Sequence, residues 1–70
     1  MTPEQIAAGL ADVDASAILK TPLPQPMEGH FFWAGTMSQA HKLAPLGIFT
    51  DDGFSVIGLA VRAILEAHNG

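Results

Sequence analysis

The sequence predicts a small, mainly helical single domain with one short β-hairpin. Three observations lead to this class. Residues 2–5 and residues 36–39 both have the T-x-x-Q pattern of a capping box at a helix start. The dipeptide Asp52-Gly53 separates two apolar runs, which is a strong local signal for a hairpin. Apolar residues then recur at helical spacing from residue 56 almost to the end of the chain.

The composition excludes several classes of protein. The chain has 70 residues, of which 49% are hydrophobic and 14% charged, whereas about 25% are charged in an average soluble domain. Three Lys or Arg against seven Asp or Glu give a net charge of -4, which cannot form the basic surface of a sequence-independent nucleic-acid binder. The absence of cysteine excludes disulfides and cysteine-based zinc sites. The apolar content is also too high for an acidic disordered tail.

The sequence predicts a cytoplasmic protein that does not enter a membrane. Its longest apolar run, residues 56–61, is far shorter than the roughly 20 residues that span a bilayer. Near the first residue, Glu4 stands where a secretory signal would carry positive charge.

The first 20 residues predict one N-terminal helix, from about Pro3 to Leu19, with a kink near Asp12. Thr2 is the expected N-cap, and Pro3 suits the first helical position. An alternative is a break, with a second short helix that runs to Lys20. Four apolar residues at helical spacing are expected to face the core: Ile6, Leu10, Val13 and Ala17.

Residues 21–29 predict a connector, because prolines at alternate positions exclude a helix and favour an extended chain. Residues 30–35 follow, with three of the five aromatic residues side by side, and predict a short core strand. In a strand, either Phe32 or the pair Phe31 and Trp33 would point away from the core. A second interpretation makes Phe32 or Trp33 the anchor of an interface with a partner.

The second half of the chain predicts a helix, a hairpin and a final helix within residues 36–67. After Thr36, Ala40 and Leu43 are expected to face inward, and Ser38, Gln39, His41 and Lys42 to face outward. Asp51-Asp52-Gly53 forms the expected hairpin turn. Ser55 is the expected N-cap of a last helix that runs to about His68.

The last helix is apolar around most of its circumference. Its polar stripe consists of Arg62 and Glu66, which are one turn apart, with Ser55 and Asn69 at the ends. A helix with so narrow a polar stripe is normally surrounded by other elements, and a chain of this length has few to offer. The sequence therefore predicts a homodimer through this helix, or another homo-oligomer, or a docking groove elsewhere.

Two segments of the second half resemble a known family. Residues 42–49 (KLAPLGIF) and residues 54–62 (FSVIGLAVR) are similar to the passages that flank the wing in small winged helix-turn-helix proteins, over about residues 36–67. The resemblance implies a winged-helix-like fold, with DNA contacts from Ser38, Gln39, His41 and Lys42. The sequence departs from the family at the hairpin tip, where Asp51 and Asp52 would repel a phosphate backbone.

The sequence predicts no enzyme, because its ionisable side chains are few and scattered. The spacing of His30, His41 and His68 does not suit a metal site, and Asp51 and Asp52 have the positions of turn residues. No phosphate-binding loop or dinucleotide motif is present. We therefore expect no catalytic residues, no metal and no cofactor.

The remaining features indicate a binding protein. The predicted function is a non-catalytic protein–protein interaction module: a small regulator, an inhibitor or an assembly subunit that binds another protein or itself. Its expected interface residues are Phe31, Phe32, Trp33 and Leu59. The alternative is a DNA-binding winged helix-turn-helix transcriptional regulator that acts as a dimer.

Overall fold

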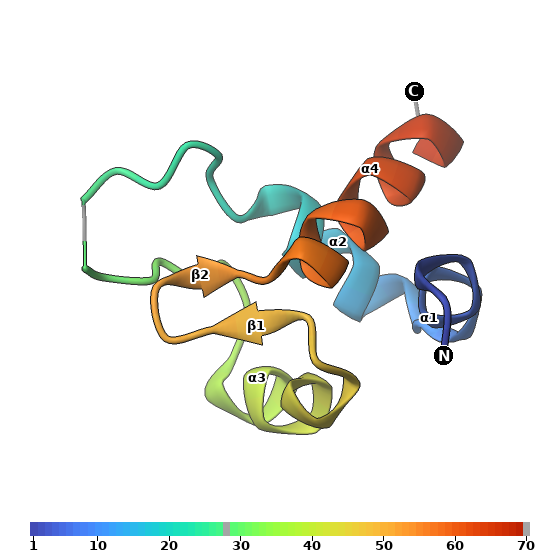
Figure 1. Ribbon diagram of the computed structural model, residues 1–70, viewed down its shortest axis with the longest axis horizontal. Coiled ribbons are helices and arrows are strands. Elements are labelled where there is room, and N and C mark those ends of the chain that lie inside the picture. Colours follow the sequence, from blue (N-terminus) through green and yellow to red (C-terminus); the bar gives the residue numbers. More distant parts are fainter. Residues whose placement is uncertain (28, 70) are drawn as a thin grey trace.

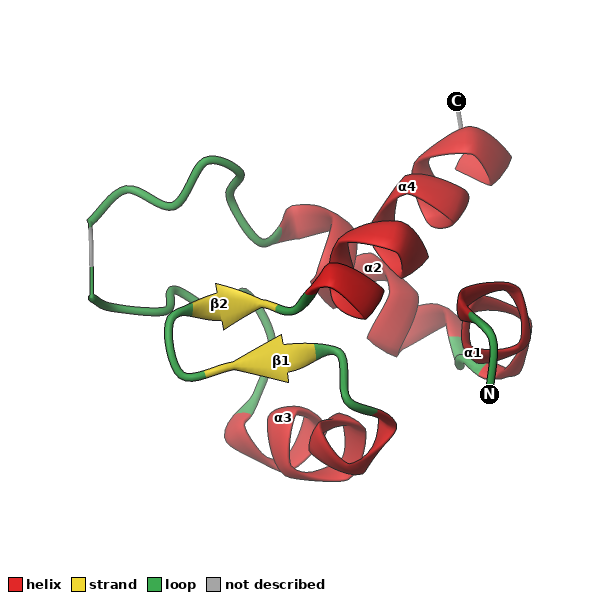
Figure 2. Ribbon diagram, viewed as in Figure 1, coloured by secondary structure: helices red, strands yellow, loops and turns green. Residues whose placement is uncertain are grey.

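The structure, a computed structural model, describes residues 1–27 and 29–69 (Figure 1). Its elements follow the order α1 (Pro3–Gly9), α2 (Asp12–Lys20), α3 (Met37–Leu43), a short 3-10 helix η1 (Ala44–Leu46), β1 (Phe49–Thr50), β2 (Gly53–Phe54) and α4 (Val56–Asn69). Figure 2 shows that helices dominate the fold and that the two strands form a single hairpin. The predicted class, a mainly helical small domain with one hairpin, is confirmed. The radius of gyration, 11.0 Å, equals the value of about 11 Å for a compact chain of this length.

The N-terminal region contains two helices, so the prediction of one helix from Pro3 to Leu19 is wrong and the alternative with a break is correct. The Thr2 capping box begins α1 as predicted, with the Gln5 N–H 3.2 Å from Thr2 Oγ1. Leu10 and Ala11 then adopt extended backbone angles, and α2 begins at Asp12. The break changes which residues of α2 face inward.

Val13 is therefore 65% exposed, contrary to the prediction that it faces the core. The buried residues of α2 are Asp14, Ala17 and Ile18, whereas Ile6 is buried in α1 and Leu10 is partly buried after it. The prediction of core positions is thus confirmed for Ile6 and Ala17, holds in part for Leu10 and is wrong for Val13.

The predicted strand at residues 30–35 does not form. Within the described part of residues 21–36, the chain makes bends and turns, and the Leu23–Pro24 peptide bond is cis. Two backbone N–H groups that a strand would use are donated to side chains instead: the Phe32 N–H to Gln25 Oε1 at 2.7 Å and the Ala34 N–H to Thr21 Oγ1 at 3.1 Å. Because side chains take these donors, the segment is held without a neighbouring strand.

The hairpin leads directly into α4. Phe49 pairs with Phe54 and Thr50 with Gly53 in an antiparallel register, around the turn at residues 51–52. As predicted, Ser55 caps α4: its hydroxyl accepts the Gly58 N–H at 3.0 Å and donates to the Gly47 carbonyl at 2.6 Å. The Ser55 side chain thus links the start of α4 to Gly47, which precedes β1.

The core lies where α1, α2 and α4 meet the end of α3 and the start of the hairpin. Its buried apolar residues are Ile6, Ile18, Leu43, Ile48, Val61 and Leu65. In Figure 1, α4 leads away from the hairpin, whereas α3 lies beneath β1. Among the described helices, none is both long enough and apolar enough to cross a bilayer.

Candidate functional site

An apolar groove of about 330 Å³ lies between α3, β1 and the aromatic segment around Phe31 and Trp33. We call it the α3 groove. Its lining residues are Phe31, Trp33, Met37, Ala40, His41, Ala44 and Phe49. All but His41 present apolar side chains, and the volume is at the lower end of the range for ligand pockets.

Packed aromatic rings form one wall of the α3 groove. The ring centroid of Phe31 lies 5.4 Å from that of Phe49 and 5.6 Å from that of Phe54, and Trp33 lies 5.2 Å from Phe49 in an edge-on contact. The Trp33 indole N–H also donates to the Thr36 carbonyl at 2.8 Å. These contacts hold the wall in place, so the groove is preformed.

The opposite wall is one face of α3 and η1. Met37, Ala40 and Ala44 occupy positions i, i+3 and i+7, which lie on the same side of a helix. Met37 is 76% exposed at the first position of α3. The Thr36–Gln39 capping box forms as predicted, so the backbone that carries Met37 is fixed.

An ion pair between the exposed Lys42 and the buried Asp14 fixes α3 to α2. The Lys42 ammonium lies 2.6 Å from Asp14 Oδ2, and Asp14 is only 2% exposed. Gln39 donates to Asp14 Oδ1 at 3.1 Å and to the Val13 carbonyl at 3.4 Å. The hydrogen bond from Lys42 lowers the pKa of the Asp14 carboxyl; burial raises it, and Gln39 and the charge of Lys42 lower it further, so the pKa lies below its ordinary value of 3.8.

The four residues that the resemblance assigns to DNA contact have different surroundings. Ser38 and His41 are exposed. Gln39 and Lys42 were expected to face outward, but both side chains bind α2 through Asp14, although Lys42 remains 60% exposed. Two of the four side chains are therefore engaged within the protein.

Arg62 is likewise engaged. Its guanidinium donates to the carbonyls of Ile18 (2.9 Å) and Thr21, and to Glu66 Oε1 at 2.9 Å, which is the predicted pairing. With a side-chain exposure of 13%, it offers little to a phosphate group. The exposed Asp51 and Asp52 lie at the hairpin turn.

The predicted interface residues divide into separate places. Phe31 and Trp33 line the α3 groove, where they also pack against the hairpin. Phe32 is 47% exposed, although the strand from which this exposure was expected does not form. Leu59 is 44% exposed on α4. Neither Phe32 nor Leu59 lines the groove.

Sequence reasoning missed Met37, Ala40, Ala44 and Phe49 as groove residues. The spacing of Met37, Ala40 and Ala44 was a usable signal, because it marks a second apolar face beside the one that contains Leu43. Phe49 carried no such signal, since its position in the groove depends on how the hairpin folds back against Phe31.

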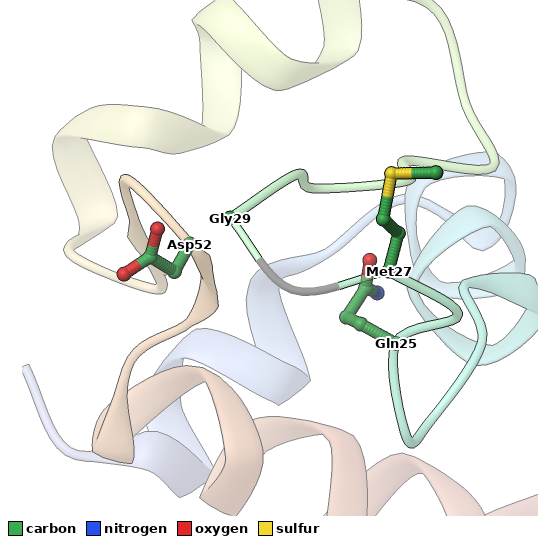
Figure 3. A pocket seen from close by; sticks show the side chains of 4 residues that line it. All are labelled: Gln25, Met27, Gly29 and Asp52. Atoms are coloured by element: carbon green, nitrogen blue, oxygen red, sulfur yellow. The ribbon is translucent and has the colours of Figure 1, made fainter.

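A second hollow, of about 440 Å³, lies between the connector and the hairpin turn (Figure 3). It is lined by Gln25, Met27, Gly29 and Asp52. The Gln25 amide is already bonded to the Pro22 carbonyl and to the Phe32 N–H. Among the lining residues that the structure describes, Asp52 is the only charged one, and these four residues do not form the convergent polar set of a small-molecule site.

No cluster of three or more His, Asp or Glu side chains that could hold a metal ion occurs in residues 1–27 and 29–69. The α3 groove is therefore the candidate site, by its apolar lining and its rigid aromatic wall. Comparisons with protein-family models, with curated proteins and with solved structures find no match to this chain.

Proposed function

We propose that this chain is a non-catalytic protein–protein interaction module that binds a partner protein in the α3 groove. The observation that carries the proposal is a preformed, almost wholly apolar groove with a largely exposed methionine on one wall. An apolar concavity beside packed aromatic rings is the typical receptor for an anchor side chain of another protein. Methionine adds a flexible side chain that adapts to the shape of the bound group.

The chemistry of the groove defines the partner segment. Its apolar lining favours large apolar side chains, such as Leu, Ile, Met or Phe, from one helix or extended segment of the partner. Burial of each such side chain stabilises a complex by roughly 1.5 to 3 kcal/mol before the costs of association. Two anchors therefore support a reversible complex, which suits a small regulator, an inhibitor or an assembly subunit.

The DNA-binding alternative has less support. The polar groups of Gln39, Lys42 and Arg62 form contacts within the chain. The carboxylates of Asp51 and Asp52 lie at the hairpin turn. Electrostatic attraction to DNA is strongest at low salt. A titration of the protein with duplex DNA at about 20 mM salt is expected to show no binding, and clear binding there would favour the regulator over the protein-binding module.

The groove is tested by selecting peptides from a random displayed library on the immobilised full chain. The affinity of the selected peptides is then measured for the wild type, for Met37→Glu and for Val13→Glu. Met37→Glu places a carboxylate on the groove wall, and its position in the first turn of α3 keeps the helix stable. Val13→Glu is the matched control, because Val13 is 65% exposed in the first turn of α2 and lies outside the groove.

We expect enriched peptides to carry paired large apolar residues and to lose at least tenfold in affinity on Met37→Glu, because a charge must be desolvated when the groove is filled. Val13→Glu is expected to bind like the wild type. Equal affinity for the wild type and Met37→Glu, or no enrichment over a blank surface, would contradict the proposal.

A further inference from the structure

The charged side chains of this chain differ in how far they are already paired. Arg62 is bonded to Glu66 and to two backbone carbonyls, and Lys42 is paired with Asp14. Among the described residues, only Lys20 keeps a Lys or Arg side chain without an acid at ion-pair distance. Four acids are exposed and form no ion pair within this described part: Glu4, Asp12, Asp51 and Asp52. The open charges on this surface are therefore mostly negative.

Two of these acids, Asp51 and Asp52, follow the strand that borders the α3 groove. They form the turn between β1 and β2, and we call them the acidic turn. Phe49 lines the groove and begins β1. Asp51 is two residues beyond Phe49, or about 7 Å along the strand. Figure 1 shows α3 beneath β1, with the hairpin turn at one end of this strand. A long side chain from a segment seated on Phe49 therefore reaches the acidic turn.

The backbone of the acidic turn is held in place, whereas its carboxylates are free. Thr50 Oγ1 accepts the Asp52 N–H and donates to the Gly53 carbonyl, both at 3.3 Å. Both carboxylates are exposed, and neither is bonded to any residue that the structure describes. In Figure 3, the Asp52 carboxylate points away from the Gln25 side chain. Two negative charges are thus presented to a partner from a fixed position.

We propose, building on the proposed function of the α3 groove, that its partner is a basic segment. An apolar anchor of the partner covers Phe49 in the groove, and a nearby Lys or Arg of the partner pairs with the acidic turn. Successive residues rise by about 3.3 Å in an extended segment and about 1.5 Å in a helix. The Lys or Arg therefore lies within about four positions of the anchor.

Charge distinguishes this partner from other occupants of the groove. A second copy of the chain carries the same net charge of -4, so it is repelled, and an acidic segment is repelled by the acidic turn. A neutral apolar segment fills the groove but gains nothing from Asp51 and Asp52. Opposite charges beside an apolar contact raise the rate of association and select the correct partner. The acidic turn thus supplies the specificity that an apolar lining lacks.

Selection of peptides from a random displayed library on the immobilised full chain tests the charge of the partner. We expect Lys or Arg to be enriched within about four positions of the paired apolar anchors, relative to the unselected library. A selected peptide is then compared with two versions in which this Lys or Arg is replaced by Gln or by Glu. At about 20 mM salt, we expect the Gln version to bind about threefold more weakly and the Glu version at least tenfold more weakly.

Two double variants of the protein locate the charge that the peptide recognises. Asp51→Asn with Asp52→Asn removes both charges of the acidic turn, and Asn also suits a turn. Glu4→Gln with Asp12→Asn is the matched control, because it removes two exposed charges from α1 and α2, outside the groove lining. We expect the first variant to bind the basic peptide at least threefold more weakly at about 20 mM salt, with a smaller loss at about 500 mM. The control is expected to bind within about twofold of the wild type.

Met37→Gln separates a failure of this proposal from a failure of the groove, because it makes the wall polar without changing the charge. We expect it to weaken the basic peptide and its Gln version alike. If Met37→Gln weakens binding but the Asp51 and Asp52 variant does not, the groove stands and the basic partner is overturned. Equal losses in the two double variants, or selected peptides without Lys or Arg near their anchors, would also overturn it. Full binding to Met37→Gln would instead contradict the proposed function.

Discussion

At the scale of single residues, Gly58 decides how closely α4 approaches the hairpin. A Cβ atom built on Gly58 would lie 2.0 Å from the carbonyl oxygen of Ile48, which is far inside the contact distance. That oxygen also accepts the Ser55 N–H at 2.9 Å, so its position is fixed. Position 58 therefore requires a residue without a side chain. The sequence alone does not show this requirement, because it arises from the contact with Ile48.

Gly58→Ala is therefore expected to destabilise the protein, whereas a Gly→Ala substitution within a helix usually stabilises it. In an ordinary helix interior, Gly→Ala stabilises by roughly 1 kcal/mol. Here the clash must be relieved by moving backbone, and we expect a loss of about 2 to 3 kcal/mol in the free energy of unfolding, measured by urea denaturation. Gly9→Ala is the control, because no atom lies within 4 Å of its Cβ position. A Gly58→Ala protein as stable as the Gly9→Ala protein would contradict the close approach.

Residue types with local roles were predicted correctly. Thr2, Thr36 and Ser55 cap helices as expected, because a cap depends on backbone N–H groups two or three positions away. Asp14, by contrast, has a long-range role. Its true partner, Lys42, lies far along the chain, and no local pattern connects the two residues.

At the scale of elements, Arg62 joins α4 to the end of α2. Its guanidinium donates to the carbonyls of Ile18 and Thr21 at the C-terminal end of α2, where backbone carbonyls lack their full helical hydrogen bonds. The Ile18 carbonyl also accepts the Thr21 N–H at 3.3 Å. The guanidinium also donates to Glu66 on its own helix. One planar group with several donors thus serves two helices, which an ammonium group cannot do in the same geometry.

Arg62→Lys keeps the charge but is expected to lower the free energy of unfolding by about 1 to 3 kcal/mol, because buried carbonyls lose charged donors. Glu66→Gln is the comparison. It removes only a surface ion pair, whose acid is 58% exposed, and is expected to cost less than about 0.5 kcal/mol. Denaturation curves of the two variants measure the difference. If the two variants lost the same free energy of unfolding, Arg62 would stabilise the protein mainly through its ion pair with Glu66, which contradicts this prediction.

The Asp14–Lys42 pair joins α2 to α3 and predicts a dependence on pH. Because Lys42 lowers the pKa of Asp14 in the folded state, the pair stabilises fully above the unfolded pKa of about 3.9. The stabilisation is lost as the pH falls through the lower folded pKa. Asp14→Asn is expected to be less stable than the wild type at pH 7, with a difference that narrows below about pH 4.

NMR titration of the Asp14 carboxyl checks this prediction directly. We expect its pKa to lie below the ordinary value in the wild type and to rise in Lys42→Met, because burial then acts without its partner. A wild-type pKa at or above the ordinary value would show that Lys42 does not pair with Asp14 in solution.

At the scale of the whole molecule, the class of fold was predictable, and two arrangements within it were not. The order of helices and hairpin follows from caps, a turn dipeptide and apolar spacing, which are all local. The break at Leu10 and Ala11 was only an alternative, because the residues there suit a helix as well as a break. The aromatic segment has the residue types of a strand but finds its partners in the side chains of Gln25 and Thr21.

The candidate site was predictable only in part. Aromatic content pointed to Phe31 and Trp33, and both line the α3 groove. The groove itself forms because Phe49 folds back on Phe31 and because the Asp14–Lys42 pair fixes α3. Both are contacts between distant parts of the chain, which residue type and spacing do not encode.

The most direct test of the protein-binding proposal is methyl NMR of the full chain during titration with a library-selected peptide. We expect the methyl resonances of Met37, Ala40 and Ala44 to shift progressively, because these groups line the α3 groove. The methyl resonances of Ala63 and Ala67, which are exposed on α4 and lie outside the groove lining, are expected to stay unchanged. Shifts confined to α4, or no shift at Met37 at saturating peptide, would contradict a function based on the groove.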